Sequence, residues 1–194
     1  MHTHTKSLLS SVILAAALST QLTACFPVVV GGAAAGGAMA ADRRTSGTYI
    51  EDEAIELKAG KAIADSLKDN VHANITSYNR QVLITGEVSD EANKKKAESL
   101  VKPIENVAGI KNHLEVAKNS SISSRTNDTY ITSKVKASFI KENKFSANYV
   151  KVVTENGTVY LLGLVTHKEA DDAVEIARSI NGVKTVVKAF EYID

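Results

Sequence analysis

An internal repeat constrains the fold of this chain more than any other feature. The segment Gln81–Val88, QVLITGEV, matches Thr158–Val165, TVYLLGLV, without a gap. Apolar residues alternate along both segments, and this period of two predicts a β-strand with one buried face. A shorter strand is expected before each repeat, at Ala73–Ser77 and Val150–Thr154, because a turn separates the two segments. The chain therefore carries two copies of one small module.

A helix and a last strand are expected after each of these hairpins. The helices are predicted from apolar residues at helical spacing, which are Ala97, Leu100, Val101 and Ile104 in the first copy and Ala170, Ala173, Val174, Ala177 and Ile180 in the second. Pro103 predicts an irregular end to the first of these helices. With an opening helix at about 52–68 and 129–143, each copy has the order α-β-β-α-β. The predicted fold class is α+β, with the helices on one face of a small three-stranded mixed sheet.

This order resembles the BON domain, a module of bacterial envelope proteins. The resemblance rests on the pattern Val-x-Leu-x-Gly-x-Val at Val159–Val165, on the spaced alanines of the following helix and on Gly182-Val183 before the last strand. The segments Asp42–Gly47 and Thr154–Thr166 are similar to a family of outer-membrane lipoproteins with two BON domains. Members of that family are associated with cell division and outer-membrane stress and bind lipid.

The beginning of the chain is interpreted as a lipoprotein signal peptide. The apolar run Leu8–Leu18 is too short for a transmembrane helix but suits a signal-peptide core. It leads to Leu22-Thr23-Ala24-Cys25, which resembles the bacterial lipobox, whose cysteine carries diacylglycerol and palmitate. An ordinary signal peptide beside an unrelated cysteine is the alternative, although an unpaired thiol is a liability in an oxidising compartment. Phe26, rather than Asp, follows Cys25, which by resemblance to enteric lipoproteins implies a lipid anchor in the outer membrane, facing the periplasm.

These patterns divide the chain into five parts. The predicted parts are a signal peptide at 1–24, a lipidated Gly/Ala-rich tether at 25–47, a first BON domain at 48–117, a linker at 118–127 and a second BON domain at 128–194. Removal of residues 1–24 takes away Lys6 and leaves 22 basic and 22 acidic residues of the original 23 and 22. A neutral chain lacks the overall electrostatic footprint of a nucleic-acid-binding protein, so no nucleic-acid partner is expected.

No constellation of catalytic residues is recognisable in the sequence. His72, His113 and His167 have no carboxylate companion at ligand spacing, and neither a phosphate-binding loop nor a nucleophile turn is present. The acidic runs Glu51-Asp52-Glu53 and Asp171-Asp172 are interpreted as charges at helix starts, where the dipole favours them. The chain is therefore expected to bind rather than catalyse, and no cofactor or metal is expected.

The second opening helix carries the candidate binding face. At about 100° per residue, Ile131, Val135 and Phe139 fall on the side that must face the sheet. The candidate phospholipid-binding residues are those of the opposite side and its flanks, namely Tyr130, Ser133, Lys134, Lys136, Ala137, Ile140 and Lys141. Residues 128–144 carry four Lys against Asp128 and Glu142, or +2, whereas residues 51–70 carry three Lys against six acids, or −3.

An apolar strip bordered by lysines suits an anionic lipid surface. The alternative is that these lysines only solvate the outer face of the helix. The family resemblance implies binding of anionic phospholipid through the second BON domain and a role in outer-membrane integrity at the division site. The expected partners are thus anionic phospholipids, the outer membrane through acylated Cys25, and envelope-assembly or division proteins. An adaptor for outer-membrane assembly or peptidoglycan machinery is the alternative function.

The other face of the second sheet is expected to be apolar. Tyr160, Leu162 and Leu164 project opposite the core residues of their strand, and Val186 and Phe190 are expected to join them. A patch of this size usually contacts something. The first domain and a foreign protein are the two alternatives.

Overall fold

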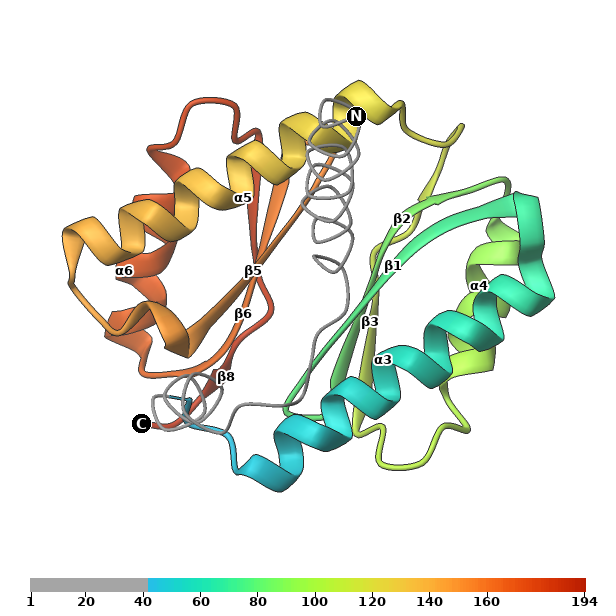
Figure 1. The fold of residues 1–194 in the computed structure, drawn as a ribbon, viewed down its shortest axis with the longest axis horizontal. Helices are drawn as coiled ribbons and strands as arrows, with labels where there is room; N and C mark the ends of the chain where they lie inside the picture. Colours follow the sequence, from blue (N-terminus) through green and yellow to red (C-terminus); the bar gives the residue numbers. More distant parts are fainter. Residues whose placement is uncertain (1–41) are drawn as a thin grey trace, which may run out of the picture. The chain divides into compact units, whose positions relative to one another are not determined.

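The computed structural model describes residues 42–194, which form two domains built in the same order (Figure 1). The predicted signal peptide, Cys25 and residues 25–41 of the predicted tether lie outside the described residues. Contacts place all described residues in one compact unit, Ala38–Asp194. Each domain has two helices on one face of its sheet, so the predicted α+β class is confirmed. Within residues 42–194 no helix has both the length and the apolarity to span a membrane.

The first domain contains one mixed sheet. Its elements in chain order are α3 (Ser46–Leu67), the 3-10 turn η1 (Lys68–Asn70), β1 (Val71–Tyr78), β2 (Gln81–Val88), α4 (Glu91–Val101), β3 (Gly109–Asn112) and β4 (Glu115–Val116). Strand β2 is central: β1 pairs with it antiparallel, and β3 and β4 pair with it parallel. The predicted last strand is thus present, but it is interrupted after Asn112. Helix α4 ends before Pro103, as the sequence predicts.

The second domain repeats this arrangement. Its elements in chain order are α5 (Ile122–Glu142), η2 (Ala147–Tyr149), β5 (Val150–Glu155), β6 (Thr158–Val165), α6 (His167–Arg178), β7 (Thr185–Lys188) and β8 (Glu191–Tyr192). Strand β6 pairs antiparallel with β5 and parallel with β7 and β8. Each repeat segment is therefore the central strand of its own sheet.

Each core lies between the sheet and its two helices. In the first domain α3 buries Ile55, Ala59 and Ile63, at intervals of four residues, against alternate side chains of β2. In the second domain α5 buries Ile131, Val135 and Phe139 in the same way, all 1% exposed or less. The predicted core-facing side of the second opening helix is correct. Both cores follow the ordinary rule that an amphipathic helix covers the apolar face of a sheet.

Both opening helices begin earlier than the sequence predicts. Helix α3 starts at Ser46 because the Thr45 hydroxyl caps it by accepting the N–H of Thr48 at 3.1 Å. Helix α5 starts at Ile122, capped by Ser121, and so takes up six of the ten residues of the predicted linker 118–127. The guanidinium of Arg125 also bonds back to the carbonyl oxygen of Ser120 at 2.9 Å. Polar residues of this kind are common both in loops and at helix starts, and here they cap both helices at earlier positions than predicted.

The glycine shared by the two repeats has a steric reason. A Cβ atom at Gly86, where φ is +112°, would lie 2.0 Å from the carbonyl oxygen of His72. A Cβ atom at Gly163 would lie 2.3 Å from the carbonyl oxygen of Tyr149. In both domains the neighbouring backbone therefore approaches the central strand too closely for any side chain.

Candidate functional site

The outer face of α5 is apolar in its middle. Tyr130 and Ile140 are 58% and 69% exposed, and Ala137 is also exposed. They face outward because Ile131, Val135 and Phe139 turn the other side of α5 into the core. The exposed side chains predicted for this face are therefore where the sequence analysis expects them. Ser133 is exposed too, and its hydroxyl donates to the Thr129 carbonyl oxygen of the same helix at 2.9 Å.

Lysines border this apolar strip without acidic partners. Lys136 and Lys141 are exposed, and Lys134 Nζ lies over the Tyr130 ring, 4.7 Å from its centroid. In the part of the chain that the structure describes, none of these three ammonium groups forms an ion pair. Lys144, just beyond the end of α5, differs, because its Nζ lies 3.2 Å from Glu175. The three bordering lysines thus keep their charge available to an external anion.

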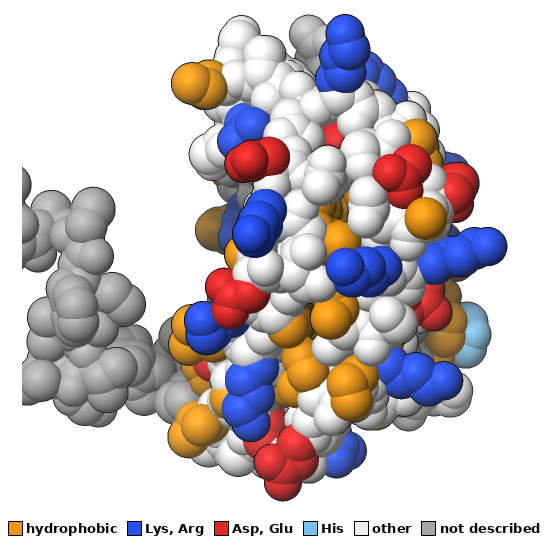
Figure 2. Space-filling model, turned by 90° about the vertical axis from the view of Figure 1, so that its right-hand side faces the viewer, with side chains coloured by type: hydrophobic (Ala, Val, Ile, Leu, Met, Phe, Trp, Pro, Cys, Tyr) orange, Lys and Arg blue, Asp and Glu red, His pale blue; other side chains and the backbone are white. Residues whose placement is uncertain are grey.

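The equivalent helix of the first domain has exposed apolar residues but a different charge. Ile50 and Leu57 of α3 are 63% and 76% exposed. Lys61 on the same helix pairs with Asp65 at 2.8 Å. Figure 2 shows the side of the molecule on which α3 and α4 lie, and basic and acidic side chains are interspersed over it. Lys58 of α3 is exposed and forms no ion pair within residues 42–194, so the two opening helices differ in the number of unpaired lysines beside the apolar residues, three on α5 and one on α3.

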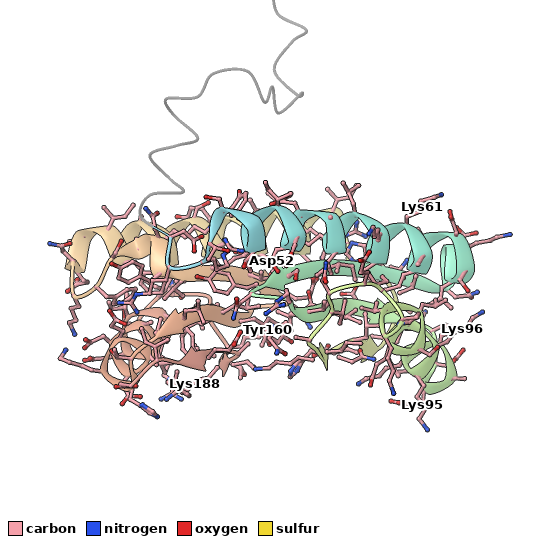
Figure 3. The ribbon with its side chains drawn as sticks, turned by 90° about the horizontal axis from the view of Figure 1, so that it is seen from below. Asp52, Lys61, Lys95, Lys96, Tyr160 and Lys188 are labelled. Carbon is pink, nitrogen blue, oxygen red and sulfur yellow. The ribbon has the colours of Figure 1, made fainter. Side chains whose placement is uncertain are left out.

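The two sheets meet through the faces that their helices leave uncovered. Tyr160, Leu162 and the half-buried Leu164 of the second domain form one apolar cluster with Tyr78 and Leu83 of the first. Tyr160 lies between the two domains in Figure 3, whereas Lys61, Lys95, Lys96 and Lys188 point outward. Burial, with the negative charges of Glu115 and Glu155, raises the pKa of Tyr160 to about 12. The first domain therefore contacts the patch on β6, which is the first of the two alternatives.

Two residues predicted for this patch lie elsewhere. Val186 and Phe190 pack into the core of the second domain. Their neighbours Val187 and Ala189 take the expected places in the interdomain cluster. The prediction is wrong because β7 pairs with β6 so that Val187, and not Val186, lies beside Tyr160, and neighbouring residues of a strand point to opposite faces of the sheet.

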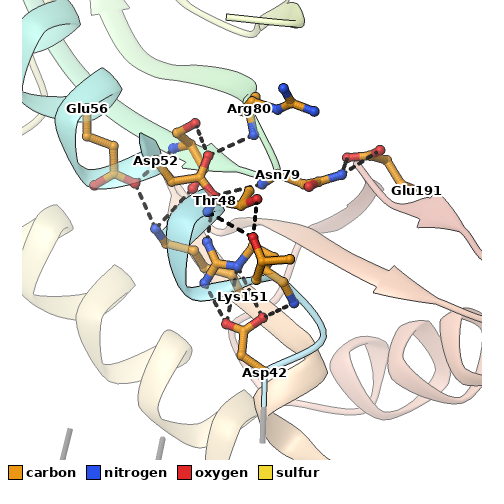
Figure 4. Close-up of polar contacts among 11 residues, drawn as sticks. Asp42, Thr48, Asp52, Glu56, Asn79, Arg80, Lys151 and Glu191 are labelled. Atoms are coloured by element: carbon orange, nitrogen blue, oxygen red, sulfur yellow. Dashed lines mark hydrogen bonds and ion pairs between the residues drawn. The ribbon is translucent and has the colours of Figure 1, made fainter. Parts of the chain in front are cut away.

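A buried aspartate in each opening helix holds the hairpin turn of its own domain. Asp52 is 2% exposed and accepts the N–H groups of Asn79 and Arg80 at 2.8 and 2.7 Å (Figure 4). Asp128 is 4% exposed and accepts the N–H groups of Asn156 and Gly157 at 2.9 and 2.8 Å. These contacts satisfy the backbone donors of two tight turns whose central residues all have positive φ.

A profile of the BON domain family matches residues 51–118 and 127–194. The chain belongs to the BON family. It is 38% identical over 175 residues to "Outer membrane lipoprotein DolP" of Haemophilus influenzae, covering 89% of this chain and 91% of that protein. It is 30% identical to the "21 kDa hemolysin" of Actinobacillus pleuropneumoniae, covering 78% and 79%, and 31% identical to "Osmotically-inducible protein Y" of Escherichia coli, covering 72% of each. The chain is a BON-family lipoprotein of the outer membrane, as predicted.

The interpretation of the acidic runs as helix-start charges is wrong. Glu51, Asp52 and Glu53 lie beyond the first turn of α3, since this helix of the first BON domain begins at Ser46. Asp171 and Asp172 pair instead with Lys188 and Lys168, at 2.9 and 2.6 Å. The first-turn acid of α6 is Glu169, which forms a capping box with Thr166.

The role of the buried aspartates was not recognised from sequence, although a signal exists. Asp52 precedes Asn79 by 27 residues, and Asp128 precedes Asn156 by 28. An acid at almost the same distance from the turn in two copies of one module would have indicated a shared structural role.

Residues at the end of the predicted tether also belong to the fold. Arg43 forms two hydrogen bonds of 2.6 and 2.7 Å with Glu169 of the second BON domain and stacks on Tyr149. Arg44 pairs with Asp42 and Asp52. Burial opposes the charged form of Arg44, but these two carboxylates outweigh burial and raise its pKa. The two neighbouring arginines thus contact different BON domains, and residues 42–47, predicted as the end of the tether, take part in the folded structure.

Two of the histidines have carboxylate neighbours that sequence spacing did not reveal. His167 Nδ1 lies 2.7 Å from Asp194, and His72 Nδ1 lies 3.0 Å from Glu87. His113 instead packs edge-on against Tyr160. Both carboxylates are brought to these histidines by folding, since they lie 27 and 15 residues away along the chain.

Proposed function

We propose that this outer-membrane lipoprotein binds anionic phospholipid from the periplasmic side through the outer face of α5, and that it supports outer-membrane integrity at the division site. One observation carries the proposal: exposed Tyr130 and Ile140 lie among Lys134, Lys136 and Lys141, which have no acidic partner within residues 42–194. The acylated Cys25 is proposed to keep this face close to the membrane. Family membership supports the proposal, since one relative is named an outer membrane lipoprotein.

The arrangement fits insertion into the boundary between headgroups and acyl chains. Ile140 gains from transfer out of water, by about 1.5–3 kcal/mol if it is fully buried. Each lysine near an anionic surface adds about 1 kcal/mol. Because Ser133 already bonds within the helix, apolar burial and charge are the two main contributions. Binding should therefore require anionic headgroups and should weaken with salt.

Vesicle flotation of the unacylated fragment 38–194 tests this function. Wild-type fragment is expected to float with phosphatidylglycerol vesicles at low salt and to remain unbound with phosphatidylcholine alone. The triple variant Lys134→Gln, Lys136→Gln and Ile140→Ser should lose binding at least tenfold, since about 1 kcal/mol per lysine corresponds to more than a tenfold change for two.

The first BON domain offers a matched control. Leu57→Ser, Lys58→Gln and Lys61→Gln make the same chemical changes on α3 and should leave flotation unchanged. Equal loss in both triple variants, or no loss in the α5 variant, would refute binding through α5. An adaptor protein, the alternative function, would bind its protein partner but show no preference for anionic vesicles.

A further inference from the structure

Three ionisable side chains from both BON domains gather where the sheets meet. His72 of β1 and Glu87 of β2 come from the first domain, and Glu155 from the end of β5 in the second. One ligand atom from each residue lies within 4.8 Å of the other two. Glu87 and Glu155 are 5% and 7% exposed. Two buried carboxylates beside an imidazole are costly to maintain unless a positive charge balances them.

The contacts within this cluster hold the side chains but leave oxygen atoms available. Glu87 Oε2 accepts from His72 Nδ1 at 3.0 Å and from the Ser120 N–H at 3.1 Å. Glu155 Oε2 accepts from the Asn74 amide at 2.7 Å. Among residues 42–194, neither Glu87 Oε1 nor Glu155 Oε1 accepts a hydrogen bond. In metal sites of proteins, hydrogen bonds from neighbouring residues orient the carboxylates that bind the ion.

One further polar group beside these side chains lacks a partner within residues 42–194. The Thr85 hydroxyl, 1% exposed, also has no hydrogen-bond partner among the described residues. Thr85 lies two positions from Glu87 on β2 and directly opposite Asn74 on β1, so it belongs to the same face of the sheet.

The cluster is accessible from solvent. A groove of about 600 Å³ runs between β1 of the first BON domain and α5 and β5 of the second. Its lining includes His72, Asn74 and Glu155. An ion could therefore enter without unfolding of either domain, and solvent could complete its coordination.

We propose that His72, Glu87 and Glu155 form a binding site for a divalent transition-metal ion that joins the two BON domains. Imidazole with carboxylate is a donor set that Zn²⁺ accepts, and a catalytic-type Zn²⁺ site has three protein ligands and one open position. Two carboxylates and a neutral imidazole balance the charge of the ion. Zn–N and Zn–O distances of about 2.0–2.2 Å require donors about 3.3 Å apart in tetrahedral geometry. His72 Nδ1 and Glu87 Oε2 lie 3.0 Å apart, close to this spacing, so metal coordination would replace their hydrogen bond and Nδ1 would lose its proton. Glu155 has only to move closer.

Calorimetric titration of fragment 38–194 with Zn²⁺ tests the site. We expect one ion per chain, a melting temperature that rises by several degrees with Zn²⁺ and falls again with EDTA, and no such response to Mg²⁺. Glu155→Gln removes the charged ligand but keeps an acceptor for Asn74, so the variant should fold and bind Zn²⁺ at least tenfold more weakly. His72→Gln, at a half-buried position, should give the same loss.

His167→Gln is the matched control, because His167 also has a carboxylate neighbour but its side chain is 65% exposed. This variant should bind Zn²⁺ as the wild type does. The proposal is overturned if the wild-type fragment binds no Zn²⁺, or if Glu155→Gln and His72→Gln fold and bind it undiminished. It is equally overturned if only His167→Gln abolishes binding, since the ion would then lie at the exposed pair His167 and Asp194.

Discussion

Replacing Asp52 by alanine should destabilise the first BON domain more than most single substitutions. The carboxylate is 2% exposed and lies on the inner side of α3. It has four partners, which are the Ser77 hydroxyl at 2.6 Å, the N–H groups of Asn79 at 2.8 Å and Arg80 at 2.7 Å, and Arg44 Nη1 at 2.8 Å. Alanine would leave two turn N–H groups, the Ser77 hydroxyl and Arg44 Nη1 without this acceptor, while Arg44 keeps its pair with Asp42.

The magnitude follows from these partners. A hydrogen bond to a charged group contributes about 1.5–3 kcal/mol, and removal of one member of a buried ion pair costs about 3–5 kcal/mol. Because one carboxylate makes all four contacts, the contributions do not add. We therefore expect Asp52→Ala to lower the free energy of unfolding by about 4 kcal/mol, and Asp52→Asn, which retains one acceptor oxygen, by about 2 kcal/mol.

Urea denaturation of fragment 38–194, followed by circular dichroism, measures this loss as a lower midpoint. Asp65→Ala is the matched control, because Asp65 lies on the same helix and pairs with Lys61, but its side chain is 65% exposed. The control should leave the midpoint unchanged, as surface ion pairs contribute little. Equal midpoints for Asp52→Ala and Asp65→Ala would refute the assigned role of the buried carboxylate.

Three further predictions concern the turn, the repeat glycine and pH. Arg80 has φ +66°, so Arg80→Gly should raise the free energy of unfolding by about 0.5–1 kcal/mol in the same assay; a decrease would contradict strain at this turn. Gly86→Ala would place Cβ 2.0 Å from a β1 carbonyl oxygen and should lower the free energy of unfolding by more than about 3 kcal/mol. Gly60→Ala on α3 meets open space and should raise it by up to about 1 kcal/mol. Similar melting temperatures for the two variants would count against the close approach at Gly86. The hydrogen bond from Arg43 lowers the pKa of Glu169 below its ordinary 4.5, so its contribution is complete above about pH 4.5 and is lost as pH falls through the lowered pKa. The difference in unfolding free energy between wild type and Glu169→Gln should therefore shrink below pH 4.5, and a difference that grows on acidification would reverse the assigned sign.

Much of the candidate phospholipid-binding face could be read from the sequence. The spacing of Ile131, Val135 and Phe139 assigns the inner side of α5, and the exposed positions follow from helical geometry. What the sequence could not show is which lysines have acidic partners. Lys144 and Lys136 look alike along the chain, but folding brings Glu175 only to Lys144. Pairing of surface charges depends on neighbours from other elements, and periodicity within one helix contains no information about them.

The sequence by itself determined that the chain contains two modules with the same order of elements. It also determined which segments are strands or helices and which side of each is apolar, because these properties depend on residues a few positions apart. The tertiary structure decided which polar groups became buried together. Asn74 meets Glu155 across 81 residues, and Asp52 meets a turn 27 residues away. It also decided that Val187, rather than Val186, faces the other domain, since strand register is set by packing of whole sheets. Such contacts arise only after folding has packed separate elements together and excluded water between them.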